Sequence, residues 1–374
     1  MPRLPALLLL CLATSMTAGL GAQSVGGQWL FLRDDPGTFP GDRAGESVAW
    51  AGDVDGDGAD DFIVGIPGAS PNGLSLAGSA QVISGADGSQ LLRFDGELAG
   101  GAAGISVDGG RDIDGDGVPD FLVGSPFATI NGFIDTGRVD CYSGATGALI
   151  HRFDGPQKYG KWGVSVTFLD DLSGDGVPEI FAGAFQAPAG GVYDAGLALV
   201  LDGATGAQIF RIIGAGVHVE LGFAVASAGD VDGDGLTDFM VSAPTDNTPT
   251  HHAGKIFVHS GADGSLIHEL LGTRDSGHMG AALASAGDVN GDGVPDILGG
   301  APTAYVNGKS AAGVVRLWSG ADGTLLAEFR GTQAGQQLGE SLAAAGDLNQ
   351  DGYADFAIGA PQTDVAGANR AGSL

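Results

Sequence analysis

Short apolar runs alternate with polar, glycine-rich segments along most of the chain. In the first unit of this pattern the apolar runs are Ser47–Gly52, Phe62–Val64, Ser79–Ser84 and Leu91–Phe94. Gly, Pro, Asn and Asp separate the runs, which is typical of short β-strands joined by turns. No apolar pattern of helical period continues for a useful length after residue 22. We therefore predict four short strands in this unit and no long helix.

An acidic nonapeptide between the first and second runs shows that the unit repeats. It occurs as DVDGDGADD, DIDGDGVPD, DLSGDGVPE, DVDGDGLTD, DVNGDGVPD and DLNQDGYAD, and the copies begin 58 or 59 residues apart. Four strands per repeat of this length fit the blade of a β-propeller, in which neighbouring blades cover both apolar faces. The repeats of a β-solenoid are shorter, and a β-sandwich needs about 100 residues. The predicted fold is an all-β propeller with six or seven blades.

Two turn signals recur at fixed places in the repeat. A Gly-x-Pro signal, with Ser replacing Gly in one copy, begins 12 residues after the first loop aspartate in five units, and the third unit has Gly183-Ala184-Phe185 there. A tight turn follows the third run at Gly85–Gly88 and in the four units after it. These turns account for part of the 69 glycines. These glycines can take positive φ and let a short hairpin close.

The nonapeptide carries side-chain oxygens at positions 1, 3, 5 and 9. The candidate side-chain ligands are Asp53, Asp55, Asp57 and Asp61; Asp112, Asp114, Asp116 and Asp120; Asp171, Ser173, Asp175 and Glu179; Asp230, Asp232, Asp234 and Asp238; Asp288, Asn290, Asp292 and Asp296; and Asp347, Asn349, Asp351 and Asp355. Position 7 is placed to offer a backbone carbonyl, from Ala59, Val118, Val177, Leu236, Val294 and Tyr353. Oxygens at alternate positions of a glycine-rich loop suit Ca²⁺, which takes six to eight oxygen ligands.

A solvated acidic turn is the alternative for any single loop. Six copies in register favour metal, because three or four crowded carboxylates without a counter-ion would raise their own pKa values. The loops hold no His or Cys, which argues against zinc, and Mg²⁺ demands stricter geometry. Strands rather than helices flank the loops, so an EF-hand is excluded. The prediction is up to one Ca²⁺ per repeat, with Ser173 and Glu179 making the third loop the weakest candidate.

Charge and the N-terminus indicate the compartment. The 45 acidic residues outnumber the 16 basic ones, for a net charge of −29, so nucleic-acid binding through a basic face is not expected. Residues 1–22 resemble a cleaved signal peptide, which implies a secreted or cell-surface protein with residues 23–374 as one propeller domain. No apolar run is long enough to span a membrane. After cleavage Cys141 is the only cysteine, and we expect it to be buried in a strand rather than disulfide-bonded.

The repeat resembles a known family. Leu221-Gly222-Phe223, the acidic loop and Gly300-Ala301-Pro302 together resemble FG-GAP repeats, the blades of the integrin α-subunit N-terminal propeller. The likeness extends from Ser47 almost to the C-terminus. It implies that each loop joins the first two strands of a blade and binds Ca²⁺, and that ligands contact the opposite face.

The chain departs from that family in its number of repeats. The integrin propeller has seven blades, whereas six nonapeptides are present here. The sixth unit reaches only Gly372-Ser373-Leu374, where its third strand is expected to start. Trp29–Leu32 is a candidate fourth strand that would complete this last blade. We therefore expect an incomplete final repeat, in a chain that is either truncated or continues into a seventh blade.

These features favour a secreted, calcium-binding adhesion module for an extracellular protein or glycan. Candidate ligand contacts on the loops away from the acidic nonapeptides are Phe127, Phe133, Trp162, Tyr193 and Tyr305, for which packing between blades is the competing interpretation. An alternative function is a propeller-type polysaccharide lyase or hydrolase with structural calcium, using histidines such as His251 and His278. No nucleophile elbow, phosphate loop or zinc motif supports catalysis. A structural role in a larger surface protein is a third hypothesis.

Overall fold

The computed structural model describes residues 41–364 and 372–374. Within this part of the chain the only helical element is a single 3₁₀ turn, η1 (Pro71–Gly73). No helix among the described residues has the length and apolar character needed to cross a membrane. The predicted signal peptide and the candidate closing strand Trp29–Leu32 lie outside the described residues.

The strands form five four-stranded antiparallel sheets and one two-stranded sheet, each with its strands in chain order. The first sheet contains β1 (Val48–Gly52), β2 (Asp61–Ile66), β3 (Ser79–Ile83) and β4 (Gln90–Asp95); the second β5 (Ser106–Arg111), β6 (Asp120–Ser125), β7 (Arg138–Tyr142) and β8 (Leu149–Asp154); the third β9 (Val166–Leu169), β10 (Glu179–Ala184), β11 (Leu197–Leu201) and β12 (Gln208–Ile213); the fourth β13 (Val225–Gly229), β14 (Asp238–Ala243), β15 (Lys255–His259) and β16 (Leu266–Leu271); the fifth β17 (Ala282–Gly287), β18 (Asp296–Ala301), β19 (Val314–Trp318) and β20 (Leu325–Arg330); and the sixth β21 (Ser341–Gly346) and β22 (Asp355–Gly359).

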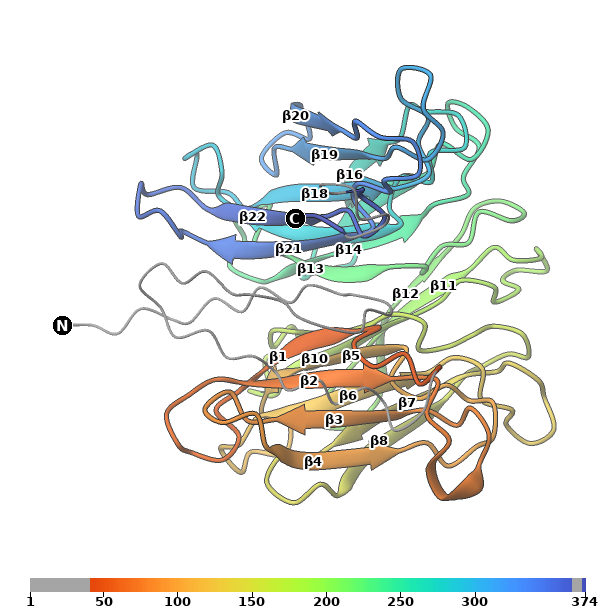
Figure 1. The fold of residues 1–374 in the computed structure, drawn as a ribbon, viewed down its shortest axis with the longest axis vertical. Coiled ribbons are helices and arrows are strands. Elements are labelled where there is room, and N and C mark those ends of the chain that lie inside the picture. Colours follow the sequence, from red (N-terminus) through yellow and green to blue (C-terminus); the bar gives the residue numbers. More distant parts are fainter. Residues whose placement is uncertain (1–40, 365–371) are drawn as a thin grey trace.

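Each sheet is one blade of a β-propeller (Figure 1). The first strands of successive blades lie against one another, β1 beside β5, β5 beside β9, and so on to β17 beside β21. The predicted four strands per unit are thus confirmed in five blades. In the sixth, Ser373 pairs with Ala360, in the register that joins β2 to β3 and β18 to β19 in other blades.

The second strand of each blade lies deepest in the fold. Every residue of β6, β10, β14 and β18 is buried, because neighbouring blades cover both faces of the sheet. One apolar cluster, for example, joins Ile63 and Val82 of the first blade to Phe121 and Val123 of the second. The outermost strands, such as β4 and β20, keep exposed positions. This burial explains why the second strands are almost entirely apolar.

Cys141 lies in β7 and is fully buried, as the sequence predicts. Burial raises the pKa of its thiol well above the ordinary value, and the nearby carboxylate of Asp120 adds to the shift. The thiol therefore stays protonated, which makes it a packing group rather than a nucleophile.

Candidate metal centre in the acidic loops

The six acidic loops lie at one end of the propeller, where each connects the first and second strands of a blade (left in Figure 1). The aspartate at position 1 organises each loop by accepting backbone hydrogen bonds with both carboxylate oxygens. In the fourth loop Asp230 accepts from the N–H groups of Gly233 at 2.7 Å and Gly235 at 3.0 Å. Asp53 plays the same part in the first loop, where Gly56 and Gly58 have φ of 75° and 89°. These positive φ values give the loop the sharp turns that glycine permits.

Carboxylates converge in three of the loops. The groups are Asp53, Asp55 and Asp57; Asp112, Asp114 and Asp120; and Asp230, Asp232 and Asp234. Within each group one oxygen from every residue lies within 4.8 Å of the others. The donor set consists of hard oxygen ligands on a backbone shaped by glycine, and this chemistry fits a divalent cation such as Ca²⁺. The other three loops carry Ser173, Asn290 and Asn349 at position 3.

The carboxylate at position 9 has a second role that the sequence pattern does not reveal. Asp61, Asp120, Glu179, Asp238 and Asp296 are fully buried. Asp238, for example, accepts hydrogen bonds from Val231 N–H at 2.7 Å and Gly261 N–H at 2.9 Å. Its two oxygens thus connect the acidic loop to the turn between the third and fourth strands. We call this pair of contacts the carboxylate clamp.

The clamp explains why the first residue of the tight turn between the third and fourth strands is glycine. Its N–H donates to the position-9 carboxylate at 2.9–3.1 Å in five blades. A Cβ on this glycine would lie 1.8–2.2 Å from a backbone carbonyl oxygen of the acidic loop. Positive φ occurs instead at the last glycine of the turn, such as Gly88 at 75°. The first glycine of the turn is therefore required by close approach, and the last by its positive φ.

Burial disfavours the charged form of the clamp carboxylates. It raises the pKa values of Asp61, Glu179, Asp238 and Asp296, and that of Asp120 to about 6. The negative charge of Asp114 adds to the shift at Asp120. A carboxyl group whose pKa is raised on folding lowers stability as the pH rises through that pKa. A cation in the loop would offset this cost.

The sixth loop differs from the other five at position 4. Gln350 stands where the other loops have glycine, and it takes a φ of 60°. A left-handed conformation costs a non-glycine residue about 1–2 kcal/mol. Its clamp residue Asp355 is only half-buried and accepts from Leu348 N–H at 2.9 Å. The sixth loop is therefore less favourably built than the others.

The opposite face of the propeller carries the aromatic residues predicted to contact a ligand. Phe133, Tyr193 and Tyr305 lie on the long loops between second and third strands and are 57%, 76% and 57% exposed. Phe127 is half-buried, with the Lys161 ammonium 5.4 Å from its ring centre. Trp162, by contrast, is 1% exposed and packs in the apolar core. Trp162 therefore offers no stacking surface, which corrects the prediction for this residue.

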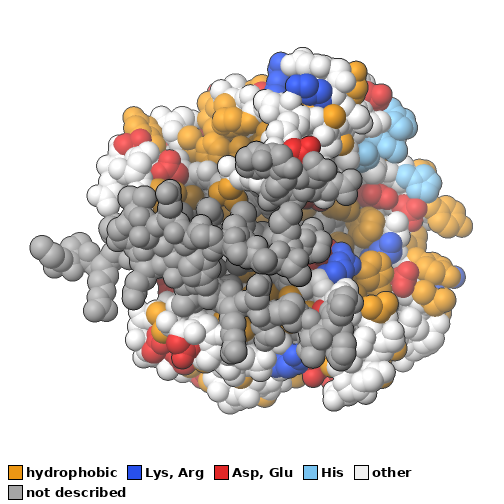
Figure 2. All heavy atoms as spheres, in the orientation of Figure 1, with side chains coloured by type: hydrophobic (Ala, Val, Ile, Leu, Met, Phe, Trp, Pro, Cys, Tyr) orange, Lys and Arg blue, Asp and Glu red, His pale blue; other side chains and the backbone are white. Residues whose placement is uncertain are grey.

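Histidines gather on the same face (right in Figure 2). The rings of His251 and His252 stack at 3.9 Å, and His252 lies 5.5 Å from His278. His278 Nδ1 is 2.7 Å from the hydroxyl of Thr303 in the next blade. Burial lowers the pKa of His278, and the neighbouring His252 and His251 lower it further.

This arrangement predicts that His278 contributes a loss of stability in acid, opposite in sign to the contribution of the clamp carboxyls. Because the pKa of His278 is lower in the folded protein than the ordinary 6.5, the unfolded chain binds the proton more readily, and stability falls as the pH drops below about 6.5. A His278→Gln variant removes the titrating group, so its urea midpoint at pH 5, relative to that at pH 7.5, should be higher than the wild type's, because the clamp carboxyls contribute equally in both proteins. An identical change in the wild type and the variant would contradict this role for His278.

Comparison with known proteins agrees with the repeat pattern. The FG-GAP repeat family matches residues 103–145 and 338–374, and an FG-GAP-like repeat matches residues 221–299. The chain carries FG-GAP repeats. Similar proteins include integrin alpha-5 from Xenopus laevis, 30% identical over 244 residues, and integrin alpha-PS2 from Drosophila melanogaster, 34% identical over 179 residues. These alignments cover 61% and 42% of this chain but only 22% and 12% of the relatives.

Each FG-GAP match begins just before the first strand of a blade. The segment 221–299 begins before β13 and ends within β18, and it contains the acidic loops at Asp230 and Asp288. Integrin alpha pat-2 from Caenorhabditis briggsae is 37% identical over 175 residues, which is 42% of this chain and 14% of that protein. The propeller is thus similar to that of integrin α subunits, while the chain spans about a fifth or less of the length of these relatives.

Proposed function

We propose that this FG-GAP propeller is a secreted, calcium-stabilised module that binds an extracellular protein or glycan without catalysis. The observation that carries the proposal is that the two faces of the propeller carry different kinds of side chain. One face holds the acidic loops, whose side chains organise the blades. The other presents exposed aromatic side chains on long loops of the second, third and fifth blades. Rigid sheets that present variable loops are a common basis for recognition.

Calcium is the proposed cofactor, at up to one ion per acidic loop. Converging carboxylates in the first, second and fourth loops support it most strongly. The ligands we propose there are the side chains at positions 1, 3, 5 and 9 and the carbonyl at position 7. Extracellular calcium is abundant enough to fill sites with dissociation constants of about 10⁻⁴–10⁻³ M. Export of residues 23–374 as one domain after cleavage of residues 1–22 is part of the same proposal.

Several histidines have structural contacts, which supports binding rather than catalysis. His151 Nε2 lies 2.8 Å from the carbonyl of Gly203, and His268 Nε2 makes the equivalent contact with Gly320 at 2.6 Å. Both contacts join one blade to the next. His259 is buried in β15 against Phe239. These side chains stabilise the packing of the blades.

The exposed aromatic face can be tested by substitution. We expect the purified propeller to bind at least one component of an array of extracellular-matrix proteins and glycans in the presence of calcium. Tyr193→Ala should weaken that binding at least tenfold, because large aromatic side chains dominate the energy of protein interfaces. Binding would be measured by surface plasmon resonance on the component captured from the array.

Tyr353→Ala is the matched control. Tyr353 is 48% exposed but lies in the sixth acidic loop, at the other end of the propeller, so its removal should leave ligand binding unchanged. Equal loss in both variants would contradict the assignment of the binding face. Turnover of a polysaccharide that disappears in His251→Gln or His278→Gln would replace the proposal with the enzymatic alternative.

A further inference from the structure

Two junctions between blades carry the same cross-strand ion pair with its charges reversed. Asp140 in β7 faces Arg152 in β8, with the Oδ1 to Nε distance at 2.7 Å. Arg316 in β19 faces Glu328 in β20 at the equivalent register, with Nη2 2.8 Å from Oε2. Both pairs lie toward the preceding blade, so they provide a direct comparison of the two junctions.

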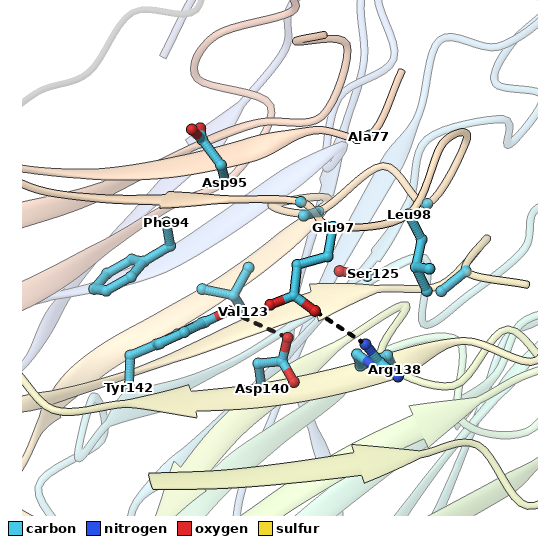
Figure 3. A pocket seen from close by; sticks show the side chains of 14 residues that line it. Ala77, Phe94, Asp95, Glu97, Leu98, Val123, Ser125, Arg138, Asp140 and Tyr142 are labelled. Atoms are coloured by element: carbon cyan, nitrogen blue, oxygen red, sulfur yellow. Dashed lines mark hydrogen bonds and ion pairs between the residues drawn. The ribbon is translucent and has the colours of Figure 1, made fainter. Parts of the chain in front are cut away.

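At the junction of the first and second blades each guanidinium group has at least one carboxylate of its own. Figure 3 shows part of this network, with Glu97 beside Arg138 and Asp140 beside Tyr142. Glu97 pairs with Arg138 and Arg152, Asp140 with Arg152, and Asp154 with Arg138. Three carboxylates therefore accompany two guanidinium groups. Tyr142 also donates its hydroxyl to Asp140, at 3.2 Å. Every charged group at this junction has a partner of opposite sign.

The junction of the fourth and fifth blades is not balanced. Arg274, Arg316 and Arg330 all pair with Glu328, and among the described residues no other carboxylate lies within ion-pair distance of them. Although burial opposes it, hydrogen bonds from these arginines lower the pKa of Glu328 to about 2, so the carboxylate stays charged. Two positive charges remain in excess, on a chain whose net charge is −29.

Blade packing accounts for only one of the three arginines. Arg316 is 8% exposed and donates four hydrogen bonds: two to Glu328, one to the carbonyl of Leu271 at 2.9 Å, and one to Thr273. It thereby ties the fifth blade to the end of β16. The buried Arg316 already pairs with Glu328, so blade packing does not require a second cation beside this carboxylate. The other two arginines would add only surface ion pairs, which are worth about 0–1 kcal/mol.

Arg274 and Arg330 leave donors unused. Each gives one hydrogen bond to the same oxygen of Glu328, from Arg274 Nη2 at 3.0 Å and from Arg330 Nε at 2.6 Å. Arg274 Nε is buried and has no hydrogen-bond partner. The side chains are 34% and 52% exposed, so solvent reaches both. Lys and Arg side chains are also grouped over β20 and the loop beside it, at the top of Figure 2.

We propose that Arg274 and Arg330 form a site for a single tetrahedral dianion, a phosphate or sulfate group, at the junction of the fourth and fifth blades. Guanidinium groups offer paired N–H donors that match the oxygens of such an anion. Two excess positive charges match two negative ones. The negative charge elsewhere on the protein is screened beyond about 8–10 Å at physiological salt, so it does not prevent local binding. Anion binding at this site does not depend on the adhesive function proposed above.

The test uses inorganic sulfate and inorganic phosphate as probes, with chloride keeping the ionic strength constant. The arginine Nε–Hε NMR signals of the intact chain would be followed during each titration. We expect saturable shifts at Arg274 and Arg330, and at least a tenfold loss of affinity in the R274Q/R330Q double variant. The buried Arg316–Glu328 pair is untouched in this variant, and its melting temperature checks that it folds.

A matched control removes two arginines that have carboxylate partners elsewhere. Arg43 pairs with Glu46 and Arg93 with Asp95, so the R43Q/R93Q variant makes the same change in net charge. It should bind sulfate as the wild type does. Equal weakening in both double variants, or linear shifts spread over all exposed arginines, would show an adventitious ion only and would overturn the proposal. A response to one probe but not the other would identify the anion that the site prefers.

Discussion

Asp238→Ala is expected to destabilise the propeller by roughly 3–5 kcal/mol, because it removes a carboxylate clamp. The buried carboxylate accepts hydrogen bonds from the backbone N–H groups of Val231, Asp232 and Gly261. Alanine would leave these donors without a partner in a region closed to water. Relief of the cost of burying the charge makes the loss smaller than the sum of three hydrogen bonds. Urea unfolding at pH 7.5 would measure it.

Asp263→Ala in the same blade is the matched control. Asp263 is exposed in the turn after β15 and accepts hydrogen bonds from Ser265, whose N–H lies 2.8 Å away, so its removal should have a far smaller effect. The clamp contacts involve only protein groups. The loss in Asp238→Ala should therefore persist in excess chelator. If Asp238→Ala and the wild type were equally stable in excess chelator, Asp238 would act only as a metal ligand.

Removal of calcium is the second large effect that we expect. A ligand that binds only the folded protein stabilises it by RT ln(1 + [L]/Kd). With dissociation constants of about 10⁻⁴–10⁻³ M and 10 mM calcium, this gives roughly 1.4–2.7 kcal/mol per site. For the three loops in which carboxylates converge the total is roughly 4–8 kcal/mol. The melting temperature should fall by roughly 6–12 °C in chelator.

Calorimetry in calcium, in magnesium and in excess chelator would measure this effect. Magnesium should replace calcium poorly, because it favours octahedral geometry and keeps its waters. The effect of the chelator should be smaller at pH 5 than at pH 7.5. At pH 5 the clamp carboxyl of Asp120, whose pKa is about 6, is mostly protonated. The proton therefore competes with the metal for this carboxylate. Melting curves that coincide in calcium and in chelator would contradict the role of the metal.

The repeat pattern predicted the architecture because local signals agree with the fold. Alternating apolar runs and fixed turns gave four strands per unit, and the structure has them in five blades. The acidic loops lie between first and second strands, and Cys141 is buried in β7. Each of these predictions depends on residues that are close in sequence or repeated at a fixed interval.

Features that depend on residues distant in sequence were missed. The clamp joins position 9 of the loop to a glycine 23 or 24 residues later. The nearly constant spacing between these two positions was the only sequence pattern that could have indicated the contact. Trp162 lies in a polar segment, but the equivalent positions Ala103, Leu221, Met279 and Leu338 are all apolar. That comparison would have indicated burial. The cluster of Arg274, Arg316 and Arg330 comes together only when two blades pack, and no local pattern marks it.

Equilibrium dialysis tests the central claim, calcium binding by the acidic loops, most directly. Bound calcium would be counted for the wild type and for a variant with Asp230→Asn, Asp232→Asn and Asp234→Asn, which keeps the clamp at Asp238. At 10 mM free calcium, which would nearly saturate sites with dissociation constants of about 10⁻⁴–10⁻³ M, we expect about three ions per chain, one for each group of converging carboxylates, and about one fewer in the variant. No calcium above the level of the buffer, or the same number in both proteins, would contradict the account.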